Sequence, residues 1–389
     1  MADLLNSKRK GRIEFQGATM NRPSGFSLSA IIASKDAGPD SLLGLSAVSL
    51  RRLWLVVPAL CALAYPSLLS LLSSGLVLVH GSASPNGVIV WVSVIASLTL
   101  ALAVMLVSFV FGLALGSPHV RDDPEGCRAR SIAHLAFATP TLYVGFGNVA
   151  YYGFQTPSAA PIAWFVFWAL VAMIALLGPR SSPIAAAMTP MGHRRLALAH
   201  GVSASAILLL FIGPHIVNHA AGFWNGPVHI AIMNVVRRVY RDDIVQPVLL
   251  ALIGFQILSG TALVRRRMRM PSDFLGTVQT MSGVFVGVYF LAHTTAVFAT
   301  RHAGTDTNWI WLTAPHGSML VSLSNLRLIA HYWVGPIAIF AHVACGLRMV
   351  LLQRDISPAT TNRIAVALIT AGVVTSSIIL AALLNVHIA

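Results

Sequence analysis

The chain has 389 residues, of which 56% are hydrophobic and only 10% charged, and its mean hydropathy is +0.76. Soluble domains carry about 25% charged residues, so this composition excludes an ordinary soluble protein and indicates an integral membrane protein in contact with lipid. The formal net charge of +14 does not indicate nucleic-acid binding, because the basic residues lie mostly in short loops and the N-terminal tail.

Apolar runs long enough to cross a bilayer follow one another after a polar, basic tail at 1–49, which we expect to be mobile. The runs are continuous rather than alternating, which excludes a membrane β-barrel. We therefore predict an all-α polytopic transmembrane helical bundle of about nine spans. The predicted spans are Leu53–Val79, Val88–Gly116, Ser131–Tyr152, Ala160–Leu177, Leu196–Ala221, Ile244–Val264, Phe274–Ala299, Arg327–Leu352 and Ile364–Asn385.

The first four spans form an N-terminal four-helix membrane module at 50–180, and the last five form a second bundle at 194–387. Pro140 and Pro214 lie inside spans and are expected to kink them. Trp164 and Trp168 are expected to anchor a span at the membrane interface. Between the fifth and sixth spans, Val228–Tyr240 is predicted to be a short amphipathic surface helix.

The distribution of Lys and Arg predicts the orientation. With the N-terminus in the cytoplasm, all but five of the 26 basic residues lie on the cytoplasmic side, and the C-terminus lies outside. The five exceptions are Arg237, Arg238, Arg241, Arg301 and Arg327. Early acidic residues, Asp3 and Glu14, are atypical of a mitochondrial transit peptide, so we expect a bacterial inner membrane rather than a mitochondrial one.

All twelve Asp and Glu residues lie in the tail or the loops, which excludes di-metal carboxylate sites and paired-aspartate proteases and disfavours a proton-coupled transporter. The ionisable groups at membrane depth are imidazoles, which bind metals and haem iron. The candidate cofactor-binding residues are His215, His219, His293, His331 and His342.

Three of these histidines, His215, His293 and His331, come from different spans at matched height, as a bis-imidazole iron site requires. His219 shares a helix face with His215. Three turns separate His342 from His331, so the two point the same way about 16 Å apart, and one helix could serve two haems.

Alternatives remain open for several histidines. A histidine near the end of a span is commonly a packing or interface residue, and this holds for His331 and His219. His134 and His200 lie near the cytoplasmic ends and are weaker candidates, although His200 could support an inner site. His229, in the surface helix, could fold back over the outer site.

The segment AHVACGLRMVL, which contains His342, resembles the His-x-x-x-Gly-x-Arg segment of the succinate dehydrogenase cytochrome b subunit. Upstream, TMSGVFVGVYFLAH is similar to the first helix of that family, with Ser282 and Gly283 matching. Thr280 stands where the family has an Arg that helps to bind quinone. The pattern GPHIVNH, with histidines on two later helices, also resembles the dihaem fumarate reductase anchors and related mitochondrial lipid-homeostasis membrane proteins.

The resemblance covers residues 194–387 and implies a cytochrome-b-like five-helix bundle with one or two b haems. It implies His342, and with it His215, His293 and His331, as ligands of haem iron. It also implies electron transfer within the membrane, with a soluble flavoprotein or iron–sulfur subunit and quinone as partners, since no soluble catalytic domain fits this chain. The alternatives are a non-enzymatic membrane adapter or lipid-homeostasis factor and, third, a small-solute transporter.

Overall fold

The computed structural model describes residues 47–80, 87–117, 123–178, 190–313 and 325–388, so the predicted tail lies almost entirely outside the described residues. The described chain is helical and contains no strand, which confirms the all-α prediction. Its elements are α2 (Ala47–His80), α3 (Gly87–Ala114), α4 (Pro124–Phe137), α5 (Thr139–Asn148), the π-helix η2 (Val149–Gly153), α6 (Ala159–Leu177), α7 (Pro190–Ile207), the π-helix η3 (Leu208–Ile212), α8 (Gly213–Ala221), α9 (Gly226–Tyr240), α10 (Val245–Arg267), α11 (Phe274–His302), α12 (Trp309–Thr313), α13 (Leu326–Leu352) and α14 (Pro358–Leu383).

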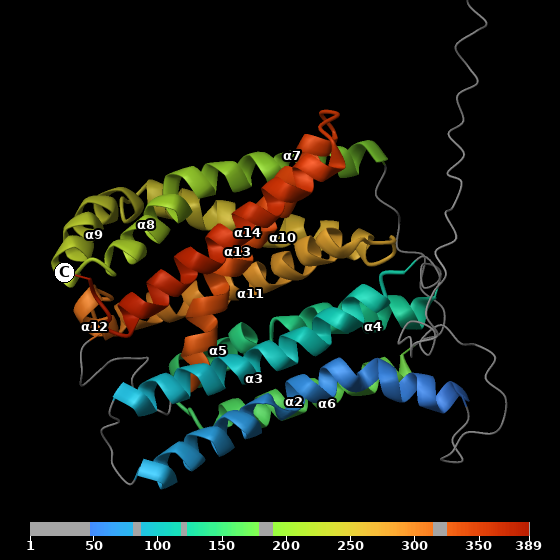
Figure 1. The fold of residues 1–389 in the computed structure, drawn as a ribbon, viewed down its shortest axis with the longest axis horizontal. Coiled ribbons are helices and arrows are strands. Elements are labelled where there is room, and N and C mark those ends of the chain that lie inside the picture. Colours follow the sequence, from blue (N-terminus) through green and yellow to red (C-terminus); the bar gives the residue numbers. More distant parts are fainter. Residues whose placement is uncertain (1–46, 81–86, 118–122, 179–189, 314–324, 389) are drawn as a thin grey trace, which may run out of the picture.

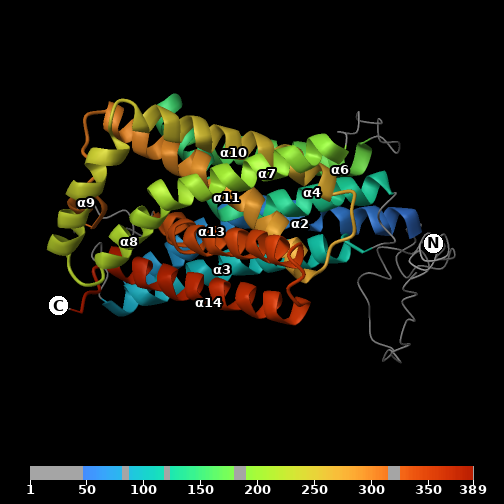
Figure 2. The same cartoon turned by 90° about the horizontal axis from the view of Figure 1, so that it is seen from above.

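Within these ranges, eight helices are long and apolar enough to cross a membrane, which makes this chain a polytopic membrane protein. They correspond to eight of the nine predicted spans. The exception is Ser131–Tyr152, where the structure has α4, α5 and η2 in place of one continuous helix. The three pieces follow one another along the bundle, and the described chain begins at one end of it and finishes at the other (Figures 1 and 2). None of these three pieces is among the eight candidate spans.

Proline explains both interruptions of regular helix. Thr139-Pro140 opens α5 directly after Ala138, because proline lacks an N–H and disfavours helical geometry in the residue before it. Gly213-Pro214 follows the π-helix η3, in which the Gly213 N–H reaches back to the Leu208 carbonyl. The expected disruptions at Pro140 and Pro214 are confirmed. A π turn also shifts the helix face by one residue, so it resets the direction in which the α8 histidines point.

The two predicted halves share one core. Buried residues of α2, α3, α5, α6, α13 and α14 belong to a single apolar cluster, and α5 packs against both α11 and α13. Trp164 and Trp168 are fully buried in this cluster, so their expected role at the membrane interface is wrong. The Trp164 indole N–H donates to the Ala62 carbonyl at 2.9 Å, which removes the need for water that draws tryptophan to an interface.

One end of the bundle is closed by short elements. Helix α9 runs across the long helices there, beside α8, α12 and the last turn of α14 (Figures 1 and 2). We call this the α9 end. At the opposite end, the buried Arg130 of α4 donates to the carbonyls of Arg267, Met268 and Met270 at 3.2, 3.3 and 2.7 Å. A cation is favourable there because the last carbonyls of α10 have no helical partner.

Candidate functional site

Five imidazoles form a continuous row near the α9 end, which we call the histidine row. In order they are His331 of α13, His293 of α11, His215 and His219 of α8, and His229 of α9. Successive ring centroids are 6.4, 6.2, 4.6 and 5.3 Å apart. The structure therefore brings together four of the five predicted site residues and adds His229, which does fold back over the outer site.

The row is enclosed by aromatic side chains. Tyr289 lies parallel to His293, with ring centroids 5.6 Å apart and planes 8° apart, and its centroid is 4.6 Å from that of His331. Gly335 makes this packing possible, because a Cβ there would lie 2.4 Å from the Tyr289 ring. At the other end of the row, the ring centroids of Trp309 in α12 and His229 lie 4.1 Å apart. His331 and His229, at the two ends of the row, are buried, and the three histidines between them are partly buried.

Hydrogen bonding along the row is incomplete. His331 Nδ1 lies 3.0 Å from the Thr141 hydroxyl, and His229 Nε2 accepts from the Asn218 amide at 3.2 Å. The Nδ1 atoms of His215, His219 and His229 are buried without a hydrogen-bond partner. Such atoms are uncommon in folded proteins, since each costs about 1–3 kcal/mol. Three of them in one row indicate nitrogen atoms available to a ligand, a metal or a mobile proton.

His342 lies apart from the row and meets a histidine from another helix. Its ring centroid is 6.2 Å from that of His200 on α7, and the two ring planes differ by 85°. The predicted separation of His342 from the outer set is therefore confirmed. His200 was a weak candidate in the sequence, where its place near a span end gave no sign of the partner across the bundle.

Both members of this pair have a fixed tautomer. His342 Nδ1 lies 3.0 Å from the Gln279 carbonyl, which only accepts, so this nitrogen carries the proton. His200 Nδ1 lies 2.8 Å from the Ser259 hydroxyl, which gives its own proton to the Phe255 carbonyl at 2.6 Å. The Nε2 atoms of both rings therefore keep free lone pairs. A hydrogen bond from the other ring nitrogen to an oxygen atom is what orients a metal-binding histidine.

Glycines leave space beside the pair. A Cβ at Gly283 would lie 2.8 Å from His342 Cε1, so this glycine gives the imidazole its room. One turn further along each helix, at Gly287 and Gly346, a Cβ would meet no atom within 4 Å. Because α11 and α13 run antiparallel, Gly287 and Gly346 lie on opposite sides of the level of His342, one toward each end of the bundle.

Among the described residues, no group of three or more His, Cys, Asp or Glu side chains is arranged to hold a metal ion. This finding argues against a multi-ligand site for a free ion, but haem iron takes only two protein ligands. The His200–His342 and His215–His293 pairs, whose ring centroids lie 6.2 Å apart, are the residues that could hold such an iron.

His134 is explained without a cofactor. It is buried, and its two ring nitrogens lie 2.8 Å from the Arg130 carbonyl and 2.9 Å from the Thr280 hydroxyl. With both nitrogens satisfied, it links α4 to α11.

Comparison with known proteins adds no assignment, since no protein-family model, curated protein or solved structure matches this chain.

Proposed function

We propose that this membrane protein binds haem b and passes single electrons within the membrane, with His200 and His342 as one axial pair. The observation that carries the proposal is the pair itself: two imidazoles 6.2 Å apart whose Nδ1 atoms are tied to oxygen atoms. Haem iron, when bound, supplies the one-electron chemistry. The residues of this chain orient the ligands through Gln279 and Ser259.

A second haem is proposed at the histidine row. His293 is the central ligand there, because its ring lies 6.2 Å from His215 and 6.4 Å from His331. His215 supports the first pairing with a buried, unpartnered Nδ1, whereas His331 is already oriented by Thr141. His219 would then be a neighbour of the ligand rather than a ligand. The two pairs lie on neighbouring helices, with His200 on α7 and His342 on α13, and with His215 on α8 and His293 on α11, which suits electron transfer along the bundle.

The proposal extends to location and partners. The loop charges support an orientation with the N-terminus in the cytoplasm and the C-terminus outside. Asp3 and Glu14 favour a bacterial inner membrane over a mitochondrial one. A soluble flavoprotein or iron–sulfur subunit is the proposed redox partner, by resemblance to the succinate dehydrogenase anchors. Quinone is less well supported, since Thr280 replaces the Arg of that family and its hydroxyl is engaged by His134.

An absorption spectrum of the detergent-purified protein, oxidised and then reduced with dithionite, tests the function. We expect a Soret band and a reduced α-band, both weakened in His342→Ala and His200→Ala and unchanged in the control His302→Ala, an exposed histidine at the end of α11. His293→Ala should remove the second haem alone. A wild-type spectrum without these bands would reject haem binding and leave the haem-free adapter or lipid-homeostasis role.

The buried Nδ1 atoms of the row favour a second candidate, proton transfer. An imidazole accepts a proton on one nitrogen and releases one from the other, and spacings of 4.6 and 5.3 Å allow nearly direct contact between rings. The gaps of 6.2 and 6.4 Å are wide enough for one bridging water. Proton flux into vesicles containing the purified protein, abolished by His219→Ala but not by His302→Ala, would support this role.

A further inference from the structure

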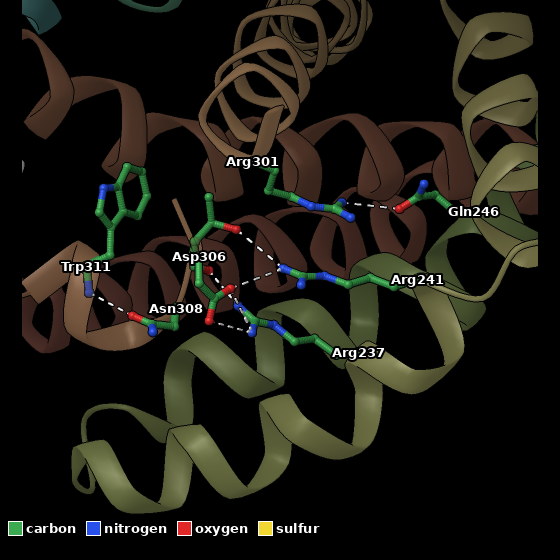
Figure 3. A network of polar contacts seen from close by, with 8 residues as sticks. Arg237, Arg241, Gln246, Arg301, Asp306, Asn308 and Trp311 are labelled. Atoms are coloured by element: carbon green, nitrogen blue, oxygen red, sulfur yellow. Dashed lines mark hydrogen bonds and ion pairs between the residues drawn. The ribbon is translucent and has the colours of Figure 1, made fainter. Parts of the chain in front are cut away.

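Two arginines, Arg237 and Arg241, meet the Asp306 carboxylate at the α9 end, and Arg301 lies near them with a partner of its own (Figure 3). Arg237 forms an ion pair with Asp306 at 3.1 Å and donates to the Thr307 carbonyl at 2.7 Å. Arg241 lies 3.8 Å from the same carboxylate and 3.4 Å from the Thr307 hydroxyl. Arg301 donates to the Gln246 side chain at 3.2 Å and lies over the Phe298 ring. We call these three arginines the arginine cluster.

The cluster has more positive charge than its surroundings neutralise. Arg237 and Arg241 are only 15% and 28% exposed, while Asp306 is 52% exposed. Burial, and then the charges of Arg237 and Arg301, lower the pKa of Arg241. The C-terminal ends of α9 and α11 each contribute about half a negative charge. Together with the full negative charge of Asp306, they leave roughly one of the three arginine charges without a counterion. Asp242 caps α10 through the Ile244 and Val245 N–H groups, and Asp243 is exposed.

Exposed apolar side chains lie on α9 and on the segments next to it. They are Trp224, Val235, Val239, Ile244 and Ile310, all more than half exposed. They lie on or beside α9, the helix that runs across the end of the membrane-spanning bundle (Figure 2). Exposed apolar residues mixed with basic ones at this position are typical of the boundary between lipid headgroups and acyl chains. A water-soluble anion would gain nothing from these apolar side chains, whereas the acyl chains of a lipid would contact them.

We propose that the arginine cluster binds the phosphate of an anionic phospholipid, whose acyl chains lie against the apolar residues around α9. A guanidinium has five N–H donors and binds phosphate oxygens in pairs. The hydrogen bonds described engage only Nη2 of Arg241 and Nη1 of Arg301, so both keep N–H groups for a ligand. Arg237 fixes the geometry through Asp306 and Thr307. The bound phosphate would neutralise the positive charge that Asp306 alone does not.

Native mass spectrometry of the full-length protein in detergent tests the proposal, with phosphatidylglycerol compared against phosphatidylcholine of the same acyl chains. We expect tighter binding of the anionic lipid, and about fivefold weaker binding in Arg241→Gln or Arg301→Gln, which corresponds to about 1 kcal/mol per basic residue near an anionic headgroup. Arg238→Gln is the matched control, since Arg238 is exposed on the same helix. Asp306→Asn should strengthen binding, because it removes the competing carboxylate.

Equal affinity for the two lipids in the wild-type protein, or equal losses in Arg301→Gln and Arg238→Gln, would overturn the proposal. A variant that fails to fold does not decide the matter alone, so Arg301→Lys, which keeps the charge, is measured beside it and should retain most of the selectivity. Inorganic phosphate at matched ionic strength is the second ligand. If it raises the unfolding temperature as much as the anionic lipid does, and Arg241→Gln abolishes both effects, the lipid is not the ligand and the site belongs to a soluble anion.

Discussion

The His200–His342 pair and the histidine row use the same side chain in opposite ways. In the pair, each Nδ1 atom has an oxygen partner and each Nε2 atom is free. In the row, three of five Nδ1 atoms are buried without a partner. The pair is therefore organised before any ligand arrives, whereas the row keeps unsatisfied nitrogens that a ligand or proton would stabilise. A burial pattern alone would not separate the two, because both contain partly buried imidazoles.

The largest expected effect comes from Gly283→Ala. The added Cβ would lie 2.8 Å from His342 Cε1 and 2.9 Å from its Nδ1, so the imidazole must move and lose its bond to Gln279. We expect loss of the haem assigned to the pair and about 1–3 kcal/mol of stability from overpacking. The reduced α-band and the thermal unfolding midpoint measure both.

Gly75→Ala is the control for this substitution. It lies in α2, which carries none of the proposed ligands, and its Cβ would meet no atom within 4 Å. It should keep the spectrum and gain a few tenths of a kcal/mol, since alanine favours a helix more than glycine does. Similar spectra for the two variants would show that the geometry of His342 does not matter for the cofactor.

Ser259→Ala tests whether tautomer control separates the pair from the row. It removes the acceptor of the His200 Nδ1 proton and leaves His200 in the state already found for His215. We expect about 10–100-fold weaker haem binding at the pair, the usual effect of losing such a partner. Thr261→Ala, an exposed position on the same helix, should have no effect in the same haem titration. Unchanged affinity in Ser259→Ala would remove the distinction between the two sites.

The row has a predicted pH response through His229, which lies outside the spans. Burial first, and then the charges of His215 and Arg237, lower the pKa of His229 to about 4. The unfolded chain, with a pKa near 6.5, binds this proton before the folded chain does. Stability should therefore fall as the pH drops from about 6.5 to about 4, by at most about 3 kcal/mol.

His229→Asn removes this titration. Its thermal unfolding midpoint, followed from pH 7 to pH 4, should vary less than that of the wild-type protein by the share that His229 contributes. His302→Asn, on the exposed end of α11, should leave the wild-type slope intact. Parallel curves for wild type and His229→Asn would mean that the proton at His229 is not coupled to folding.

The sequence predicted the helical class, eight of the spans and most of the row because continuous apolar runs and histidines at membrane depth are visible locally. The third predicted span is not one continuous helix in the structure, because α4 ends at Phe137 and Thr139-Pro140 opens α5. The partnership of His200 with His342 depends on how α7 packs beside α13, which no local pattern encodes. The interface role predicted for Trp164 and Trp168 is wrong for the same reason, since a partner such as the Ala62 carbonyl is known only from the fold.

The smallest predicted effect concerns how the N-terminal helices support the row. Thr141 of α5 lies 3.0 Å from His331 Nδ1, while Thr139, two residues earlier, has a buried hydroxyl without a partner. Thr141→Val should cost about 1 kcal/mol, because it leaves His331 as unsatisfied as its neighbours in the row. Thr139→Val, of the same size and burial, should be neutral or slightly stabilising, since it removes an unpaired polar atom. Thermal unfolding of both variants measures the difference, and equal midpoints would show that α5 packs against the row without orienting it.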